Sequence, residues 1–190
     1  MNAKYVLLGL AICSAAIVAA ATPGAPPKPV DITRSHGFKN ARMCTFQPAG
    51  EKLFEGIDSL RYKKSLRLIR KISGIDLAID GRRSSVPDSS GGSDVAGSAI
   101  ATPVRPVRWH GLPVRSFVTG YSQEAESDLQ YWNEIRVDAS PAQARALLRR
   151  LGVKYPASGS YIIRSNDPCD RALSVEGKVG MTTIQCAGGC

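Results

Sequence analysis

Two histidines, His36 and His110, are the residues of this 190-residue chain whose type best suits acid–base chemistry. Each lies among arginines and beside a glycine, in the runs RSHG at 34–37 and RWHG at 108–111. An imidazole titrates near neutral pH, so one ring can act as a base and the other as an acid in cleaving a phosphodiester. The pair indicates one hypothesis, a secreted hydrolase of ribonuclease type with His36 and His110 as catalytic residues. Two ordinary loop histidines would give the same pattern.

Five carboxylates also lie close together in the sequence, with two aromatic residues among them. A glycosidase needs two carboxyl groups facing each other across a cleft, and an aromatic ring can stack on the sugar. Three of these carboxylates, however, alternate within an expected turn, which is typical of a solvent-exposed hairpin. The residues are Glu124, Glu126, Asp128, Tyr131, Trp132, Glu134 and Asp138.

The strongest binding candidate is the run at 59–73. When its residues are placed 100° apart, most apolar side chains share one arc and five cations share the opposite arc, which predicts an amphipathic helix that ends at Gly74. Such a face can engage a nucleic acid, an anionic membrane or an acidic protein. It is also the ordinary appearance of a solvated helix surface. The cations are Lys63, Lys64, Arg67, Arg70 and Lys71.

The first twenty-one residues have the pattern of a secretory signal. Lys4 precedes an apolar run at 6–18, and three alanines at 19–21 form a small-residue cleavage site. The run is too short for a transmembrane anchor, so we expect an exported protein, periplasmic or secreted. Loss of Lys4 lowers the formal charge from +9 by one, to +8. This charge favours anionic partners, nucleic acid among them.

The cysteines predict disulfide bonds. Cys13 lies in the signal, and an even number remains, namely Cys44, Cys169, Cys186 and Cys190. An even set in an exported chain indicates two bonds, and three connectivities are possible. We favour Cys169–Cys186, between neighbouring strands, together with Cys44–Cys190, which would tie the C-terminal tail to the N-terminal half. No histidine lies near the last two cysteines, so we expect no metal site and no cofactor.

Local patterns predict the remaining elements. Residues 22–30 are proline-rich and read as an extended leader, and residues 31–50 read mainly as loop. Ser140 opens a helix with a capping box and a proline in its first turn. The expected strands are 75–80, 113–121, 129–137, 161–164, 173–175 and 181–186.

Residues 82–103 are rich in serine, glycine, proline and alanine, and we expect them to form a long mobile loop. The predicted fold over 31–190 is a single α+β domain. It has a small antiparallel sheet, two amphipathic helices packed on one face and a long flexible internal loop.

No motif is specific enough to name a reaction. The favoured hypothesis is an exported, non-enzymatic binding protein of inhibitor, immunity or secreted-effector type, which engages a protein or an anionic surface through the basic face.

Overall fold

The structure, a computed structural model, describes residues 27–61, 66–87, 93–123, 129–157, 159–163 and 170–189. The expected signal at 1–21, the start of the leader at 22–26 and the acidic segment at 124–128 lie outside these residues. The end of the leader forms the short strand β1 (Val30–Asp31).

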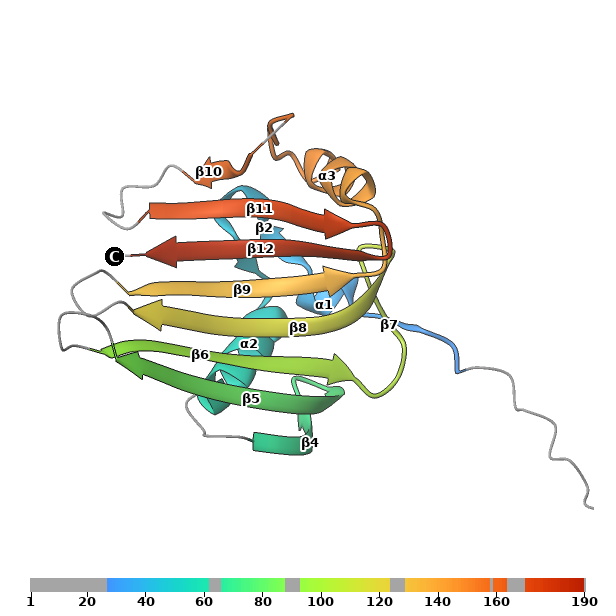
Figure 1. Cartoon of the computed structure of the whole chain (residues 1–190). Coiled ribbons are helices and arrows are strands. Elements are labelled where there is room, and N and C mark those ends of the chain that lie inside the picture. The colour runs from blue at the N-terminus through green and yellow to red at the C-terminus, as the bar shows by residue number, and fades with distance from the viewer. Residues whose placement is uncertain are drawn as a thin grey trace, which may run out of the picture.

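One large sheet dominates the described residues (Figure 1). It has ten strands, and all of its pairs are antiparallel except the one between β1 and β7. The short strand β7 also pairs with β8. In spatial order the other strands are β10 (Tyr161–Ile163), β11 (Asp170–Lys178), β12 (Met181–Gly189), β9 (Gln130–Val137), β8 (Leu112–Gln123), β6 (Ser93–Pro103), β5 (Ile75–Pro87) and β4 (Leu66–Ile72), while β7 spans Val107–Trp109.

The N-terminal segment supplies most of the layer behind the sheet. In chain order it consists of α1 (Thr33–His36), β2 (Phe38–Asn40), the 3-10 turn η1 (Ala41–Met43), β3 (Thr45–Phe46) and α2 (Pro48–Arg61). Strands β2 and β3 pair with each other in a separate small sheet. Helix α2 crosses behind β8, β6 and β5, while α3 (Pro141–Arg150) packs near β11 and β12 (Figure 1).

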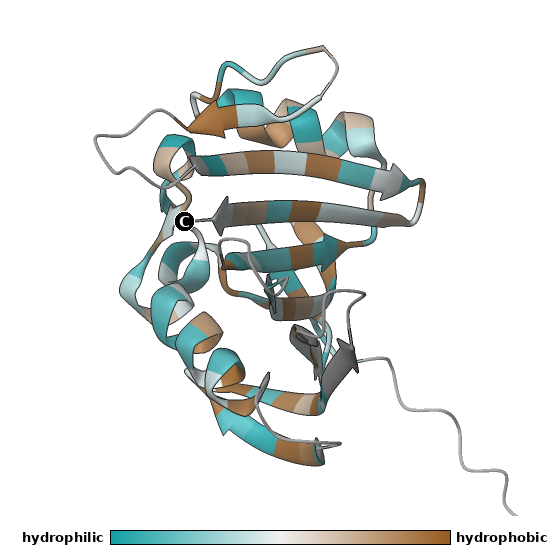
Figure 2. Cartoon of the chain, turned by 60° about the vertical axis from the view of Figure 1, so that its left-hand side comes forward, coloured by the Kyte–Doolittle hydropathy of each residue, from teal (hydrophilic) through white to brown (hydrophobic). Residues whose placement is uncertain are grey.

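Helix α2 begins at Pro48, where the missing N–H of a proline is tolerated. Glu51 stabilises this end by accepting a hydrogen bond of 2.6 Å from the backbone N–H of Phe46. Four apolar side chains recur at helical spacing and are buried against the sheet: Leu53, Phe54, Ile57 and Leu60. Each contributes roughly 1.5–3 kcal/mol by leaving water. Hydrophilic and hydrophobic residues alternate along the helices and strands, as this one-sided packing requires (Figure 2).

The expectation of a small sheet with two helices on one face is wrong. The main reason is that residues 82–103 are largely strand rather than mobile loop, since β5 and β6 pair from Leu77↔Pro103 to Pro87↔Ser93. Their small residues serve packing: Ala99 and Ala101 are fully buried on the side where α2 crosses the sheet. The small residues that make 82–103 resemble a disordered segment therefore allow α2 to pack closely against the sheet. Residues 88–92 lie outside the described residues.

The predicted helix at 59–73 is also wrong. Helix α2 ends at Arg61, and β4 begins at Leu66. Gly74 is not a helix stop but belongs to a two-residue turn with Ser73, in which both residues have positive φ, 50° and 86°. That geometry matches a type I′ hairpin turn, whose twist fits the flanking strands. Residues of 66–72 therefore point alternately to the two faces of a strand, with Arg67, Ile69 and Lys71 on one face and Leu68, Arg70 and Ile72 on the other.

Other expected elements are confirmed. Each predicted strand at 75–80, 113–121, 129–137, 173–175 and 181–186 falls on a strand of the sheet. The predicted strand at 161–164 falls on β10 over 161–163, and its last residue lies outside the described residues. Helix α3 has the expected capping box, in which Ser140 Oγ accepts from the Gln143 backbone N–H, and Gln143 Oε1 accepts from the Ser140 backbone N–H.

A disulfide joins Cys44, directly after η1, to Cys186 on β12. This bond uses one cysteine from each favoured pair, so both Cys169–Cys186 and Cys44–Cys190 are wrong. Cys169 and Cys190 lie outside the described residues. The separation of 142 residues means that the bond closes a loop containing most of the described chain.

We predict that the double variant Cys44→Ser/Cys186→Ser is much less stable than the parent protein. Loop closure over 142 residues corresponds to about 5 kcal/mol in the chain-entropy model, and measured losses are commonly about 2–5 kcal/mol. Urea unfolding monitored by tryptophan fluorescence measures the difference. Equal unfolding midpoints for the two oxidised proteins would contradict the prediction.

Candidate functional site

His36 is buried and fully engaged inside the fold. Only 6 % of the surface of this residue is exposed to solvent. Nε2 lies 3.0 Å from the Ser73 carbonyl oxygen, which can only accept, so Nε2 carries the proton. Nδ1 then accepts from Ser35 Oγ at 2.8 Å. Burial lowers the pKa of His36 below its ordinary value, and the bond to Ser73 opposes this shift only in part.

His110 occupies the turn between β7 and β8, and its φ is 49°. Its backbone N–H donates to Thr33 Oγ1 at 2.6 Å, and its Nε2 accepts from the Phe38 N–H at 3.4 Å. Burial lowers the pKa of His110, and the charge of Arg150 lowers it further, while Asp31 acts in the opposite direction. The ring also packs edge-on against Trp109.

His36 is the last residue of α1, and His110 contacts Thr33 of α1 and Phe38 of β2, but each ring has its own internal partners. Trp109 marks their proximity, because its Nε1 donates to the His36 carbonyl at 3.2 Å. Acid–base catalysis on a bound phosphodiester requires two rings that reach the substrate. The burial of His36 and its bonds to Ser35 and Ser73 give that hypothesis no support, and they assign His36 a structural role in holding the turn between β4 and β5.

The basic residues of the sequence hypothesis lie on an edge strand. Arg67, Arg70 and Lys71 are exposed on β4, whereas Lys63 and Lys64 lie outside the described residues. Strand β4 ends the spatial order of the sheet, and no described strand pairs with its outer edge. Lys71 Nζ lies 4.0 Å from Asp76, with both side chains exposed, so this contact adds little.

The hairpin turn fixes which residues present their backbone to the open edge. In a two-residue hairpin the flanking pair, here Ile72 and Ile75, exchanges both hydrogen bonds. Bonded and non-bonded pairs then alternate along the strands. The N–H and C=O groups of Arg67, Ile69 and Lys71 therefore point away from β5, toward the free edge.

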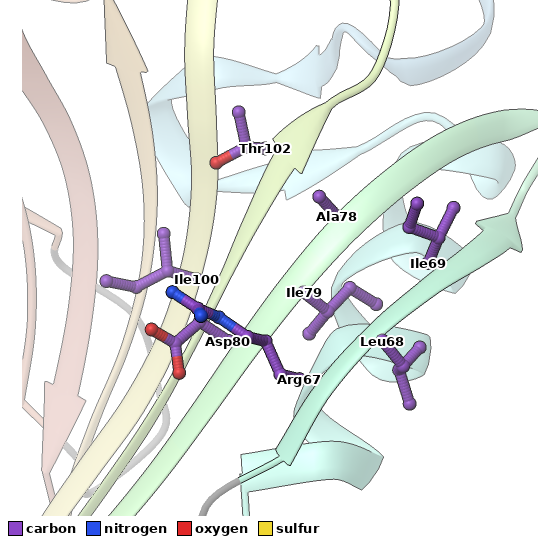
Figure 3. Close-up of a pocket in the computed structure, with 8 residues that line it drawn as sticks. All are labelled: Arg67, Leu68, Ile69, Ala78, Ile79, Asp80, Ile100 and Thr102. Carbon is purple, nitrogen blue, oxygen red and sulfur yellow. The ribbon is translucent and has the colours of Figure 1, made fainter.

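The side chains of these same three residues lie on the sheet face opposite α2. On that face β4, β5 and β6 border a groove of about 590 Å³. Ile69, which is 75 % exposed, stands at its rim. Figure 3 shows Arg67 extending over β5 toward Asp80 and Ile100. The groove is lined by Arg67, Leu68, Ile69, Ala78, Ile79, Asp80, Ile100 and Thr102.

Two further exposed cations lie on another element. Arg149 and Arg150 are exposed in the last turn of α3, which packs near β11 and β12. These strands are close to the sheet edge opposite β4 (Figure 1). The cations of α3 and those of β4 therefore do not form one surface, and those of β4 adjoin the groove.

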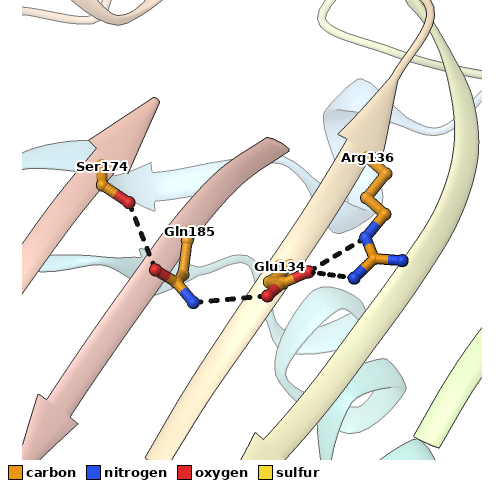
Figure 4. A network of polar contacts seen from close by, with 4 residues as sticks. All are labelled: Glu134, Arg136, Ser174 and Gln185. Atoms are coloured by element: carbon orange, nitrogen blue, oxygen red, sulfur yellow. Dashed lines mark hydrogen bonds and ion pairs between the residues drawn. The ribbon is translucent and has the colours of Figure 1, made fainter. Parts of the chain in front are cut away.

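A polar network spans three central strands on the same outer face of the sheet (Figure 4). Glu134, 8 % exposed, accepts from Arg136 at 2.9 and 3.0 Å and from Gln185 Nε2 at 3.3 Å. Gln185 Oε1 in turn accepts from Ser174 Oγ at 3.2 Å. Because its carboxylate is enclosed by these partners, Glu134 serves as a link between strands.

The aromatic residues of the glycosidase hypothesis both border one small pocket, of about 260 Å³. Tyr131 lies over Gly188 and Trp132 over Gly120. As consecutive residues of β9, they point to opposite faces of the sheet. The carboxylates that line this pocket are Glu51, Glu55 and Asp58 of α2, and neither Glu134 nor Asp138 is among its lining residues. The predicted carboxylates at 124–128 lie outside the described residues.

The groove itself was missed by sequence reasoning. Its lining residues come from three strands, and two of them, Ile100 and Thr102, fall in the segment expected to be mobile. The available signal for a hairpin was Ser73-Gly74 followed by the alternating run at 75–80, since 66–72 does not itself alternate between apolar and polar residues. Reading it as a strand would have placed Arg67, Ile69 and Lys71 on one face.

Comparison with protein-family models, with curated proteins and with solved structures finds no match to this chain. Among the described residues, no helix is long and apolar enough to cross a membrane.

We predict that stability falls as the pH drops from 7 to 5. Both histidines have folded-state pKa values below the ordinary 6.5, so the unfolded chain binds protons first. The stabilisation is complete above about pH 6.5 and is lost as the pH falls toward the folded-state values. His36→Gln keeps a donor but does not titrate, and it should flatten the slope of unfolding free energy against pH. Identical slopes for the parent and this variant would contradict the assignment.

Proposed function

We propose that this protein is an exported, non-enzymatic binding protein that engages an acidic protein partner through the basic edge strand β4. The observation that carries the proposal is the combination of exposed Arg67, Arg70 and Lys71 with an unpaired strand edge in the described part of the chain. The expected signal at 1–21 and the disulfide Cys44–Cys186 support export.

Charge supports an acidic partner. Strand β4 carries no carboxylate, and neither Arg67 nor Arg70 has an ion pair with another described residue. Their guanidinium groups are therefore free to pair with a partner's carboxylates, which they can do bidentately. Complementary charge also speeds encounter at low salt.

The groove supports a polypeptide over a nucleic acid or a membrane. Its apolar lining, including Ile69, Ala78 and Ile100, suits side chains rather than phosphates. Single-stranded nucleic acids need aromatic rings beside the cations. Trp132 is four strands away from β4, which is about 19 Å at ~4.8 Å a strand. The groove also lacks the aromatic anchors of a membrane-binding surface.

We predict that Arg67→Glu/Arg70→Glu weakens binding of a fluorescent glutamate-rich polypeptide by about tenfold or more, because repulsion replaces attraction at the contact. Fluorescence anisotropy at physiological ionic strength measures this, with heparin, an RNA oligonucleotide and anionic vesicles as competitors. The matched control is Arg149→Glu/Arg150→Glu, which changes the charge equally on α3.

The control variant should bind the polypeptide as the parent does. Equal losses in both variants would show diffuse attraction by net charge and would remove the assignment to β4. Competition by heparin or RNA at lower concentrations than by the polypeptide would favour those partners and overturn the choice of an acidic protein.

A further inference from the structure

Three residues of β4 combine every feature needed to accept another strand. Arg67, Ile69 and Lys71 direct their backbone N–H and C=O groups toward the open edge, because their pairs with β5 are the non-bonded ones. Their side chains share the face of the sheet that carries the groove, which Arg67 and Ile69 line. No backbone group of another described residue is hydrogen-bonded to this edge. Three donors and three acceptors are thus available in a row.

Building on the proposed function, we propose that the acidic partner binds by adding an extended segment to β4 as an antiparallel strand. Residues directly opposite one another in such a pair share a face of the sheet and interact. The partner residues opposite Arg67 and Lys71 are then acidic, and the one opposite Ile69 is apolar and covers the rim of the groove. The recognised pattern is acid–x–apolar–x–acid.

In both β4 and the added strand, the residues between these three paired positions face the side of the sheet where α2 lies. Arg70 is one of the β4 residues on that side, and it is exposed because β4 is at the edge. A further acidic residue opposite Arg70 would therefore add to binding. This alternation distinguishes strand addition from loose attraction, which depends on the number of charges and not on their spacing.

A second copy of this chain fits the edge poorly. Antiparallel pairing of two β4 strands about Ile69 would set Arg67 of each copy opposite Lys71 of the other, and like charges directly opposite are unfavourable. The same cations can act as a guard against strand pairing between copies. An acidic strand is attracted by the same cations, so these cations can both oppose self-association and select an acidic segment.

The test uses a synthetic peptide in which two glutamates flank a Thr-Val-Thr centre, with capped ends. In the antiparallel pair, the valine N–H points toward β4 and the threonine N–H groups point away from it. N-methylation of the valine should weaken binding by about tenfold, because it removes a hydrogen bond and places a methyl group in the ladder. N-methylation of one threonine should leave the dissociation constant within about twofold.

A scrambled peptide with adjacent glutamates tests the spacing, and Ile69→Pro tests the edge, since proline removes an N–H that faces outward and leaves the bonds to β5 in place. Weaker binding in both cases supports the proposal.

Equal binding of both N-methylated peptides would overturn strand addition while leaving the basic edge as a binding surface. Binding of the glutamate-rich polypeptide but not of the patterned peptide would do the same. Failure of both ligands would remove the proposed function itself. Dimers in sedimentation that the peptide dissociates would assign the edge to a second copy and overturn the inference.

Discussion

Helix α2 buries Leu53, Phe54, Ile57 and Leu60 against one face of a single large sheet, and this contact sets the geometry of everything else. Because side chains alternate along a strand, covering one face determines which residues of every strand are buried and which face solvent. A shift of one residue in β5, β6 or β8 would bring polar residues of that strand against α2. The position of Ile69 and its neighbours on the open face therefore follows from the packing of a helix that does not touch the groove.

The N-terminal elements hold this arrangement at the point where the edge strand begins to turn. The Ser73 carbonyl accepts from His36 of α1, and the Ser73 hydroxyl donates to the Ala49 carbonyl of α2 at 2.7 Å. Two helices thus fix one residue of a tight turn, and the turn fixes the register of β4 on β5. His36, which first indicated catalysis, acts here by donating a buried hydrogen bond to the Ser73 carbonyl oxygen.

The sequence was sufficient for the strands with clear alternation and for the helix that starts at Ser140, because these signals are local. It was insufficient for α2, which contains Gly50 and Gly56, residues that lower helix propensity by about 1 kcal/mol each. Close packing requires glycine at both positions. A Cβ on Gly56 would lie 2.6 Å from Ile72, and a Cβ on Gly50 would lie 2.8 Å from the His36 carbonyl oxygen. Contacts between residues far apart in sequence, such as His36 with Ser73 or Cys44 with Cys186, have no local signature. The composition of 82–103 misled for the same reason, since only the approach of α2 explains its alanines.

The bond between Cys44 and Cys186 has a consequence for biosynthesis. A chain is made from its N-terminus, so Cys44 emerges early and has to wait until nearly all of the sheet has been synthesised before its native partner exists. Cys169 precedes Cys186 and offers an earlier thiol with which Cys44 can react. Cys44–Cys169 is therefore the mispaired bond that the order of synthesis makes available, and an enzyme that isomerises disulfides would convert it to the native bond.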